Sequence, residues 1–191
     1  TRVFFLFTPL SLEIVAVTGA VTALIGALGT LSHFDIKKIL AYSTISQMGF
    51  MMIAIGMGNS QAALLHLFTH AFFKACLFLC AGSVINALHL AQHQSHLDFD
   101  AQDIRNMGGL AKSLPVTFVA FTLSASALAG VPLLSGFLSK EAILAHLWNQ
   151  TGSFASLILF LTCIVSFLTA AYSFRMLKFV FMGRPAFEGR I

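Results

Sequence analysis

The chain consists of long apolar runs separated by short polar segments. The runs cover about residues 10–31, 38–57, 62–87, 116–148 and 154–181. Each reaches or exceeds the roughly 20 residues that an α-helix needs to cross the hydrocarbon core of a bilayer. None alternates apolar and polar positions as the strands of a membrane barrel do. The pattern therefore predicts an all-α integral membrane protein with five transmembrane helices, forming a single membrane domain over residues 1–191.

The fourth run is too long for one straight crossing, and Gly130, Pro132 and Gly136 interrupt it. Proline has no backbone N–H and clashes with the carbonyl group four residues earlier. Interrupted backbone at membrane depth is tolerated only where protein or water satisfies the freed groups, and in transporters it marks the central site. We expect a discontinuous fourth helix, broken near residues 130–136. The alternative is a proline kink that only shapes packing, with Lys140 reaching to the membrane surface.

The composition supports a membrane protein, because 58% of the residues are hydrophobic and only 9% are charged. Soluble domains contain about 25% charged residues. If successive loops alternate sides, one side holds Lys37, Lys38, Arg105, Lys112, Arg175, Lys178, Arg184 and Arg190, and the other holds Arg2. The positive-inside rule then places the loop that we expect at 88–115 on the cytoplasmic or matrix side. The net charge of +4 is thus a matter of topology, and nucleic-acid binding is not indicated.

Two lysines, Lys74 and Lys140, lie within the apolar runs, where a charged side chain costs a few kcal/mol or more. His66, His70 and Lys74 are four residues apart, which places them on one helix face about 6 Å from each other. Direct hydrogen bonds cannot cover that distance, but one or two waters could. The spacing favours a proton relay. The alternative is three buried residues that each donate to a backbone carbonyl.

Other polar residues are less specific. Glu141 follows Lys140 directly, and neighbours on a helix point about 100° apart, so the two need not form a pair. The second run begins with several polar residues, which fits a water-lined interior or ordinary hydrogen bonds between helices. These residues are Ser43, Thr44, Ser46 and Gln47.

No cofactor or metal is expected in this chain. A cluster of possible metal ligands between His89 and Asp100 lacks a recognised spacing. Motifs for nucleotides, haem and iron–sulfur clusters are absent from the sequence. The chain begins without Met inside an apolar run, so we expect it to be part of a longer protein.

Four segments closely resemble one protein family. They are DIKKILAYSTISQMGFM (35–51), HLFTHAFFKACLFLCAGSVI (66–85), QDIRNMGGL (102–110) and ALAGVPLLSGFLSKEAIL (127–144). They resemble the distal antiporter-like subunit of respiratory complex I, which is subunit L in bacteria and subunit 5 in mitochondria. The order THAFFKA, GSVI, DIRNMGGL favours this subunit over its sister subunits. The resemblance runs from about Pro9 to the last helix, but the loop between His89 and Gln102 is longer than usual, which leaves its role open.

The resemblance implies that the five helices form the second of two inverted five-helix repeats. By the same resemblance, His66, His70 and Lys74 are the central proton relay. Lys140 is the terminal lysine of the broken helix, and Glu141 is its acidic neighbour. The implied function is proton translocation coupled to electron transfer elsewhere in NADH:quinone oxidoreductase.

The resemblance also implies where the chain works and with what. NADH, FMN, iron–sulfur clusters and quinone would then belong to other subunits. The implied partners are the other membrane subunits of complex I, lipids and protons. The implied location is the bacterial inner membrane, or the mitochondrial inner membrane in a eukaryote. Two alternatives stay open, a subunit of a multi-subunit sodium/proton antiporter and a membrane-anchoring or assembly subunit without transport.

Overall fold

The computed structural model describes residues 7–95 and 99–183 of the chain. The described part is entirely helical apart from its connections. It contains α1 (Pro9–Ser32), α2 (Ile36–Gly56), α3 (Ser60–Ser95), the short 3-10 turn η2 (Ile104–Asn106), α4 (Pro115–Ala129), α5 (Ser135–Trp148) and α6 (Ser153–Phe181). Four of these helices, α1, α2, α3 and α6, are long and apolar enough to cross a membrane. The protein is therefore an all-α, multi-pass membrane protein.

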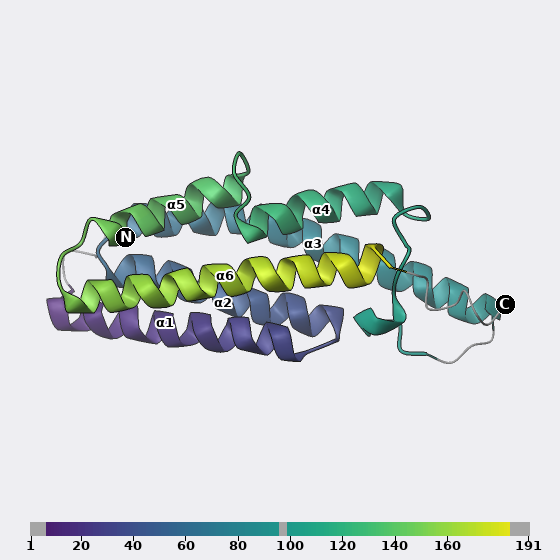
Figure 1. The fold of residues 1–191 in the computed structure, drawn as a ribbon, viewed down its shortest axis with the longest axis horizontal. Coiled ribbons are helices and arrows are strands. Elements are labelled where there is room, and N and C mark those ends of the chain that lie inside the picture. The colour runs from purple at the N-terminus through teal and green to yellow at the C-terminus, as the bar shows by residue number, and fades with distance from the viewer. Residues whose placement is uncertain (1–6, 96–98, 184–191) are drawn as a thin grey trace.

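The helices run lengthwise in an elongated bundle (Figure 1). Consecutive long helices alternate in direction, so the α1–α2 turn and the α3–α4 connection lie at the same end. The helices α4 and α5 follow each other along one edge of the bundle, with a short loop between them. Helix α6 returns alongside and contacts α1, α4 and α5. The break between α4 and α5 therefore falls in the middle of the bundle, beside α3.

The first two helices approach each other unusually closely. Gly19 and Gly26 of α1 lie against the backbone of α2, and Gly49 and Gly56 of α2 lie against the backbone of α1. A Cβ atom added to Gly49 would lie only 2.7 Å from the Cα atom of Ala23. Small residues allow helix backbones in membranes to approach in this way, and dispersion contacts then hold them together. This tight pair forms one wall of the bundle.

The interior of the bundle holds polar groups among mostly apolar side chains, and the outer faces of the bundle are apolar. Its interior contains polar or charged side chains from α2, α3, α5 and α6 that are nearly inaccessible to solvent. Its outer faces carry exposed large apolar side chains, among them Leu10, Phe68, Phe72, Leu79 and Phe167. Lipid tails or apolar partners suit such a surface, whereas the buried polar groups need partners within the protein. We therefore expect the functional side chains to lie in the interior of the bundle.

One prediction about the elements needs correction. The loop expected at 88–115 begins later, because α3 continues to Ser95. The residues after Ile85 are mostly good helix formers without Gly or Pro, so the helix outlasts the apolar run. Leu88 is still buried, and Gln92 donates to the carbonyl of Phe99 at 3.2 Å. His96 and Asp98, which belong to the loop, lie outside the described residues.

The fourth apolar run is interrupted in the structure. The run 116–148 forms two separate helices, α4 and α5, of 15 and 14 residues. Neither has the length of a membrane-spanning helix. The described residues thus contain four long apolar helices and two half-length ones.

Candidate proton-transfer site

The break between α4 and α5 follows from its glycine and proline. Helix α4 ends in a Schellman motif, in which Gly130 adopts a left-handed conformation with φ of 84°. The Gly130 N–H donates to the carbonyl of Ala127 at 3.1 Å, and the Val131 N–H donates to that of Ser126 at 3.0 Å. Pro132 comes next and cannot donate at all. The helix therefore stops here, and α5 begins three residues later at Ser135.

The break leaves the carbonyl oxygen of Leu128 without its helical partner, and Lys140 binds this oxygen. In an unbroken helix, the carbonyl of Leu128 would accept from the N–H of residue 132, which is a proline. The Lys140 Nζ donates to this oxygen instead, at 2.6 Å. The lysine is only 4% exposed, and its Nζ lies 5.6 Å from the ring centroid of Phe50. The carbonyl end of a helix also carries partial negative charge, which favours a cation there. The broken helix is thus what accommodates the buried lysine.

Lys74 is held in a similar way by α2. It lies on α3, is 5% exposed, and its Nζ donates to the backbone oxygen of Leu40 at 3.0 Å. The same Nζ donates to the hydroxyl oxygen of Ser43. Ser43 in turn donates to the Leu40 carbonyl at 2.9 Å. Both buried lysines are therefore bound by neutral oxygen atoms of a neighbouring helix.

Neither lysine has a carboxylate partner in residues 7–95 and 99–183. The one ion pair between side chains in this part of the chain joins Arg105 and Asp103, outside the helical core. Glu141 is exposed on the outer side of α5, where it lines a pocket of about 280 Å³ between α5 and α6. The structure therefore does not bring Glu141 to the lysines. A lysine without a buried anion can lose its proton and leave no unpaired charge behind.

The two histidines lie on α3, about one and two turns before Lys74. His66 is fully buried and His70 is 5% exposed, and their ring centroids are 6.0 Å apart. The His66 Nδ1 lies 2.9 Å from the Ser139 hydroxyl oxygen of α5, and its Nε2 lies 3.1 Å from the Gln47 side-chain oxygen of α2. The His70 Nε2 is buried and has no hydrogen-bond partner among the described residues. His66 thus connects three helices, whereas His70 has an unmet hydrogen-bonding atom.

The four-residue spacing indicates His66, His70 and Lys74, and a charge within an apolar run indicates Lys140, but neither signal points to Ser139. Ser43 and Gln47 belong to the polar start of the second run, which alone indicates no specific role for them. A signal was present, because Ser43 and Gln47 are four residues apart and so share a face of α2. Ser139 carried no comparable signal, since one serine beside a lysine is common.

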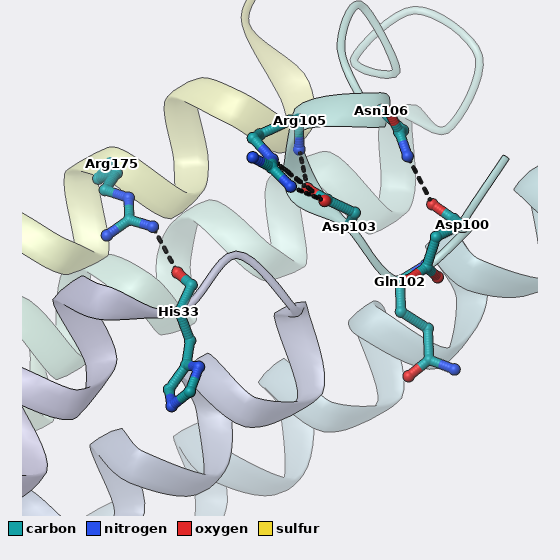
Figure 2. Close-up of polar contacts among 7 residues, drawn as sticks. All are labelled: His33, Asp100, Gln102, Asp103, Arg105, Asn106 and Arg175. Carbon is teal, nitrogen blue, oxygen red and sulfur yellow. Dashed lines mark hydrogen bonds and ion pairs between the residues drawn. The ribbon is translucent and has the colours of Figure 1, made fainter.

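A second polar cluster closes the end of the bundle where α1 meets α2 (Figure 2). Arg175 of α6 donates to the backbone oxygens of Leu31 and His33, at the end of α1. The guanidinium carbons of Arg175 and Arg105 lie 4.9 and 4.3 Å from the ring centroid of Phe34. A cation this close to an aromatic ring is attracted electrostatically to the electron-rich face of the ring. The aromatic ring is therefore held by arginines from two different elements.

The connection between α3 and α4 is tied to the same place. The Ile36 N–H donates to the Gln102 carbonyl at 2.9 Å, and the Ile104 N–H donates to the Phe34 carbonyl at 2.8 Å. Figure 2 shows Arg105 turned toward Asp103, to which it donates at 2.6 Å. The hydrogen bonds from Arg105 lower the pKa of the Asp103 carboxyl group. These contacts fix the long connection against the α1–α2 turn.

The chain is similar to known membrane proteins. Residues 1–166 match the family described as NADH:quinone oxidoreductase/Mrp antiporter, TM. The chain is 42% identical over 184 residues to NADH-ubiquinone oxidoreductase chain 5 of Acanthamoeba castellanii, covering 96% of this chain and 26% of that protein. It is 45% identical over 170 residues to chain 5 of Sus scrofa, covering 88% and 26%.

A solved structure shares the fold. The structure of the Mrp complex from Dietzia sp. DQ12-45-1b matches with a TM-score of 0.69 and 32% identity, covering 88% of this chain and 19% of that one. The chain spans about a quarter of the length of the curated relatives it matches. It belongs to the NADH:quinone oxidoreductase/Mrp antiporter transmembrane family, and within that family most of its length is similar to chain 5 of NADH-ubiquinone oxidoreductase.

Proposed function

We propose that the chain moves protons across a membrane as part of a longer, distal antiporter-like subunit of NADH:quinone oxidoreductase. The observation that carries this proposal is the pair of buried lysines, Lys74 and Lys140, held by neutral oxygens with two histidines near them. Such residues are costly in a membrane protein and mark ion or proton paths. The similarity to chain 5 supports the assignment to this complex.

The proposed setting follows from that assignment. NADH, FMN, iron–sulfur clusters and quinone are held by other subunits, and electron transfer there drives the protons here. The partners are the other membrane subunits of the complex and the surrounding lipid. The membrane is the bacterial inner membrane or, in a eukaryote, the mitochondrial inner membrane.

We infer that α4 and α5 cross the membrane together. At 1.5 Å per residue they are about 22 and 21 Å long, and each alone falls short of the roughly 30 Å hydrocarbon core. End to end they follow the length of the bundle (Figure 1). Five crossings result, the fourth of them discontinuous. This number and the central break are what the second inverted five-helix repeat of the family requires.

The mechanism assigns each residue a step. Lys74 is the interior relay, His66 and His70 connect it onward, and Lys140 exchanges protons with the far side. Two charges 6 Å apart repel by about 3 kcal/mol at an effective dielectric constant of about 20. A proton on one group therefore favours release from the next. A water molecule on the unpartnered Nε2 of His70 would complete the connection to Lys74.

Glu141 has a different place in this scheme. It faces outward from α5, away from the buried cluster. We assign it to the step after Lys140, in which the proton leaves the bundle toward the pocket between α5 and α6.

The test uses the full-length subunit in its assembled complex. Replacing Lys74 or Lys140 with Met removes the protonatable group but keeps the apolar stem. Lys178→Met, at an exposed position near the end of α6, is the matched control. We expect fewer protons pumped per NADH oxidised in the two buried variants and normal pumping in the control. Normal pumping in both buried variants would overturn the proposal.

A sodium/proton antiporter subunit is the second candidate function. The family description names the Mrp antiporter, and the similar solved structure is an Mrp complex, so both support this second candidate. Sodium-dependent proton transport in vesicles without NADH oxidation would identify it. A purely anchoring subunit is tested by replacing His66, His70 and Lys74 together with apolar residues, because an anchor would leave pumping intact.

A further inference from the structure

The side-chain amide of Gln47 has a defined orientation. Its Nε2 lies 3.4 Å from the hydroxyl oxygen of Thr169 on α6. The Thr169 hydroxyl donates its own hydrogen to the Val165 carbonyl at 2.8 Å, so its oxygen can only accept from Gln47. The amide nitrogen must therefore face Thr169. The amide oxygen, which only accepts, faces the Nε2 of His66.

This orientation determines which ring nitrogen of neutral His66 carries the hydrogen. Because Gln47 offers an acceptor, the His66 Nε2 carries the hydrogen and donates it. The His66 Nδ1 then holds a lone pair, and the Ser139 hydroxyl donates to it at 2.9 Å. Thr69 donates to the Ser139 oxygen at 3.0 Å. In neutral His66, every member of this chain of hydrogen bonds is satisfied.

Protonated His66 is satisfied by the same atoms. With a hydrogen on Nδ1, the imidazolium donates to the Ser139 oxygen. The Ser139 hydroxyl can then turn to the Gly136 carbonyl at 3.2 Å. Thr69 can turn to the His66 carbonyl, also at 3.2 Å. Only two hydroxyl groups rotate, and no heavy atom has to move.

We propose that His66 gains and loses its mobile proton at Nδ1 and exchanges it with the Ser139 hydroxyl of α5, while Gln47 keeps Nε2 protonated. This inference rests on the proposed function and adds to it the atom of His66 that exchanges the proton and the residue that exchanges it. A proton arriving at the Ser139 oxygen forms a new O–H bond as the original O–H bond breaks and its hydrogen passes to Nδ1. Serine is unchanged, and the imidazole gains one proton. Release reverses both bonds.

The step joins α3 to the broken helix. Ser139 immediately precedes Lys140 in α5, and its alternative acceptor, Gly136, lies in the first turn after the break. The titratable groups that act on His66 are Lys140 from α5 and His70 from α3. The groups that contact it from α2 are Gln47 and Phe50, which are uncharged. A proton on His66 therefore disfavours a proton on Lys140 through like-charge repulsion.

The first test compares Ser139→Ala with Ser139→Thr in the full-length subunit within the assembled complex. Ser46→Ala is the matched control, because the buried Ser46 hydroxyl of α2 donates to the Ala23 carbonyl at 2.9 Å, away from His66. We expect Ser139→Ala to slow NADH-driven proton pumping about tenfold, which corresponds to about 1.4 kcal/mol. Ser139→Thr keeps the hydroxyl and should restore pumping, and Ser46→Ala should pump normally.

The second test reads the pH dependence of pumping, which a purely structural role would not shift. In Gln47→Glu, a carboxylate beside Nε2 favours the imidazolium, since an opposite charge at this distance raises proton affinity by about one to three units. The pH profile should therefore move to higher pH by about one unit or more. An unshifted profile in Gln47→Glu, or Ser139→Ala pumping as well as Ser46→Ala, would refute the step.

Failure of the proposed function and failure of the Ser139 step give different results. If Lys74→Met and Lys140→Met pump normally, the proposed function is wrong. If those variants are impaired while Ser139→Ala pumps normally, the proposed function stands and the path through Ser139 is wrong.

Discussion

Replacing Gly136 with alanine tests how closely the break and the buried lysine depend on each other. Gly136 packs against the last turn of α4 so tightly that an added Cβ would lie 2.7 Å from the carbonyl carbon of Ala127. Carbon atoms pack at about 3.5–4.0 Å. The carbonyl oxygen of Ala127 would lie closer still, so the two helices must part by at least about 1 Å.

That displacement reaches Lys140, which lies one turn after Gly136 on the same face of α5. Its hydrogen bond to the Leu128 carbonyl, now 2.6 Å, would lengthen to about 3.6 Å. A buried donor that loses its acceptor costs about 1–3 kcal/mol, and more if it is charged. Because 1.4 kcal/mol corresponds to a factor of ten, a cost of about 1 kcal/mol corresponds to about fivefold, and we expect pumping to slow by about fivefold or more.

The assay is NADH-driven proton pumping in vesicles that contain the assembled complex, with the amount of assembled complex measured in parallel. Gly82→Ala in α3 is the matched control, because a Cβ there meets nothing within 4 Å in the described structure. The reasoning is refuted if Gly136→Ala and Gly82→Ala pump at the same rate per assembled complex.

Three further predictions follow from the packing and from the polar end of the bundle. Arg175→Lys should lower the temperature at which the purified complex loses this subunit, because lysine cannot donate from two nitrogens to the two carbonyls; an unchanged temperature contradicts this. Gly49→Ala should reduce assembly by forcing α1 and α2 apart, and normal assembly on native gels would contradict it. Since Arg105 lowers the pKa of Asp103 below its ordinary value, their ion pair is intact at neutral pH and is lost as pH falls through the lowered pKa. Hydrogen exchange in η2 should accelerate over that range in the wild type, and Asp103→Asn should remove the pH dependence.

The long helices were predictable because a membrane requires a continuous apolar length. Hydropathy alone found α1, α2 and α6 within about two residues of their observed bounds. It failed at the end of α3, where the apolar run ends but helix-forming residues continue to Ser95. The break after Ala129 was also predictable, since Gly130 and Pro132 leave few alternatives to a helix end.

The partners of the buried groups could not be predicted from one helix at a time. The spacing of His66, His70 and Lys74 indicated a shared face, and all three are buried. Their acceptors come from other helices, as with Leu40 for Lys74 and Leu128 for Lys140. A backbone carbonyl has no signature in the sequence, because every residue carries one. The outward position of Glu141 likewise depends on how α5 is rotated against its neighbours.

The central claim is that Lys140, bound to the carbonyl that the helix break exposes, carries protons. It is tested most directly by the number of protons pumped per NADH oxidised when Lys140→Met is the sole change in the full-length subunit. The account predicts a ratio below that of the wild type, with Lys178→Met unchanged. A wild-type ratio in fully assembled Lys140→Met complex would contradict it.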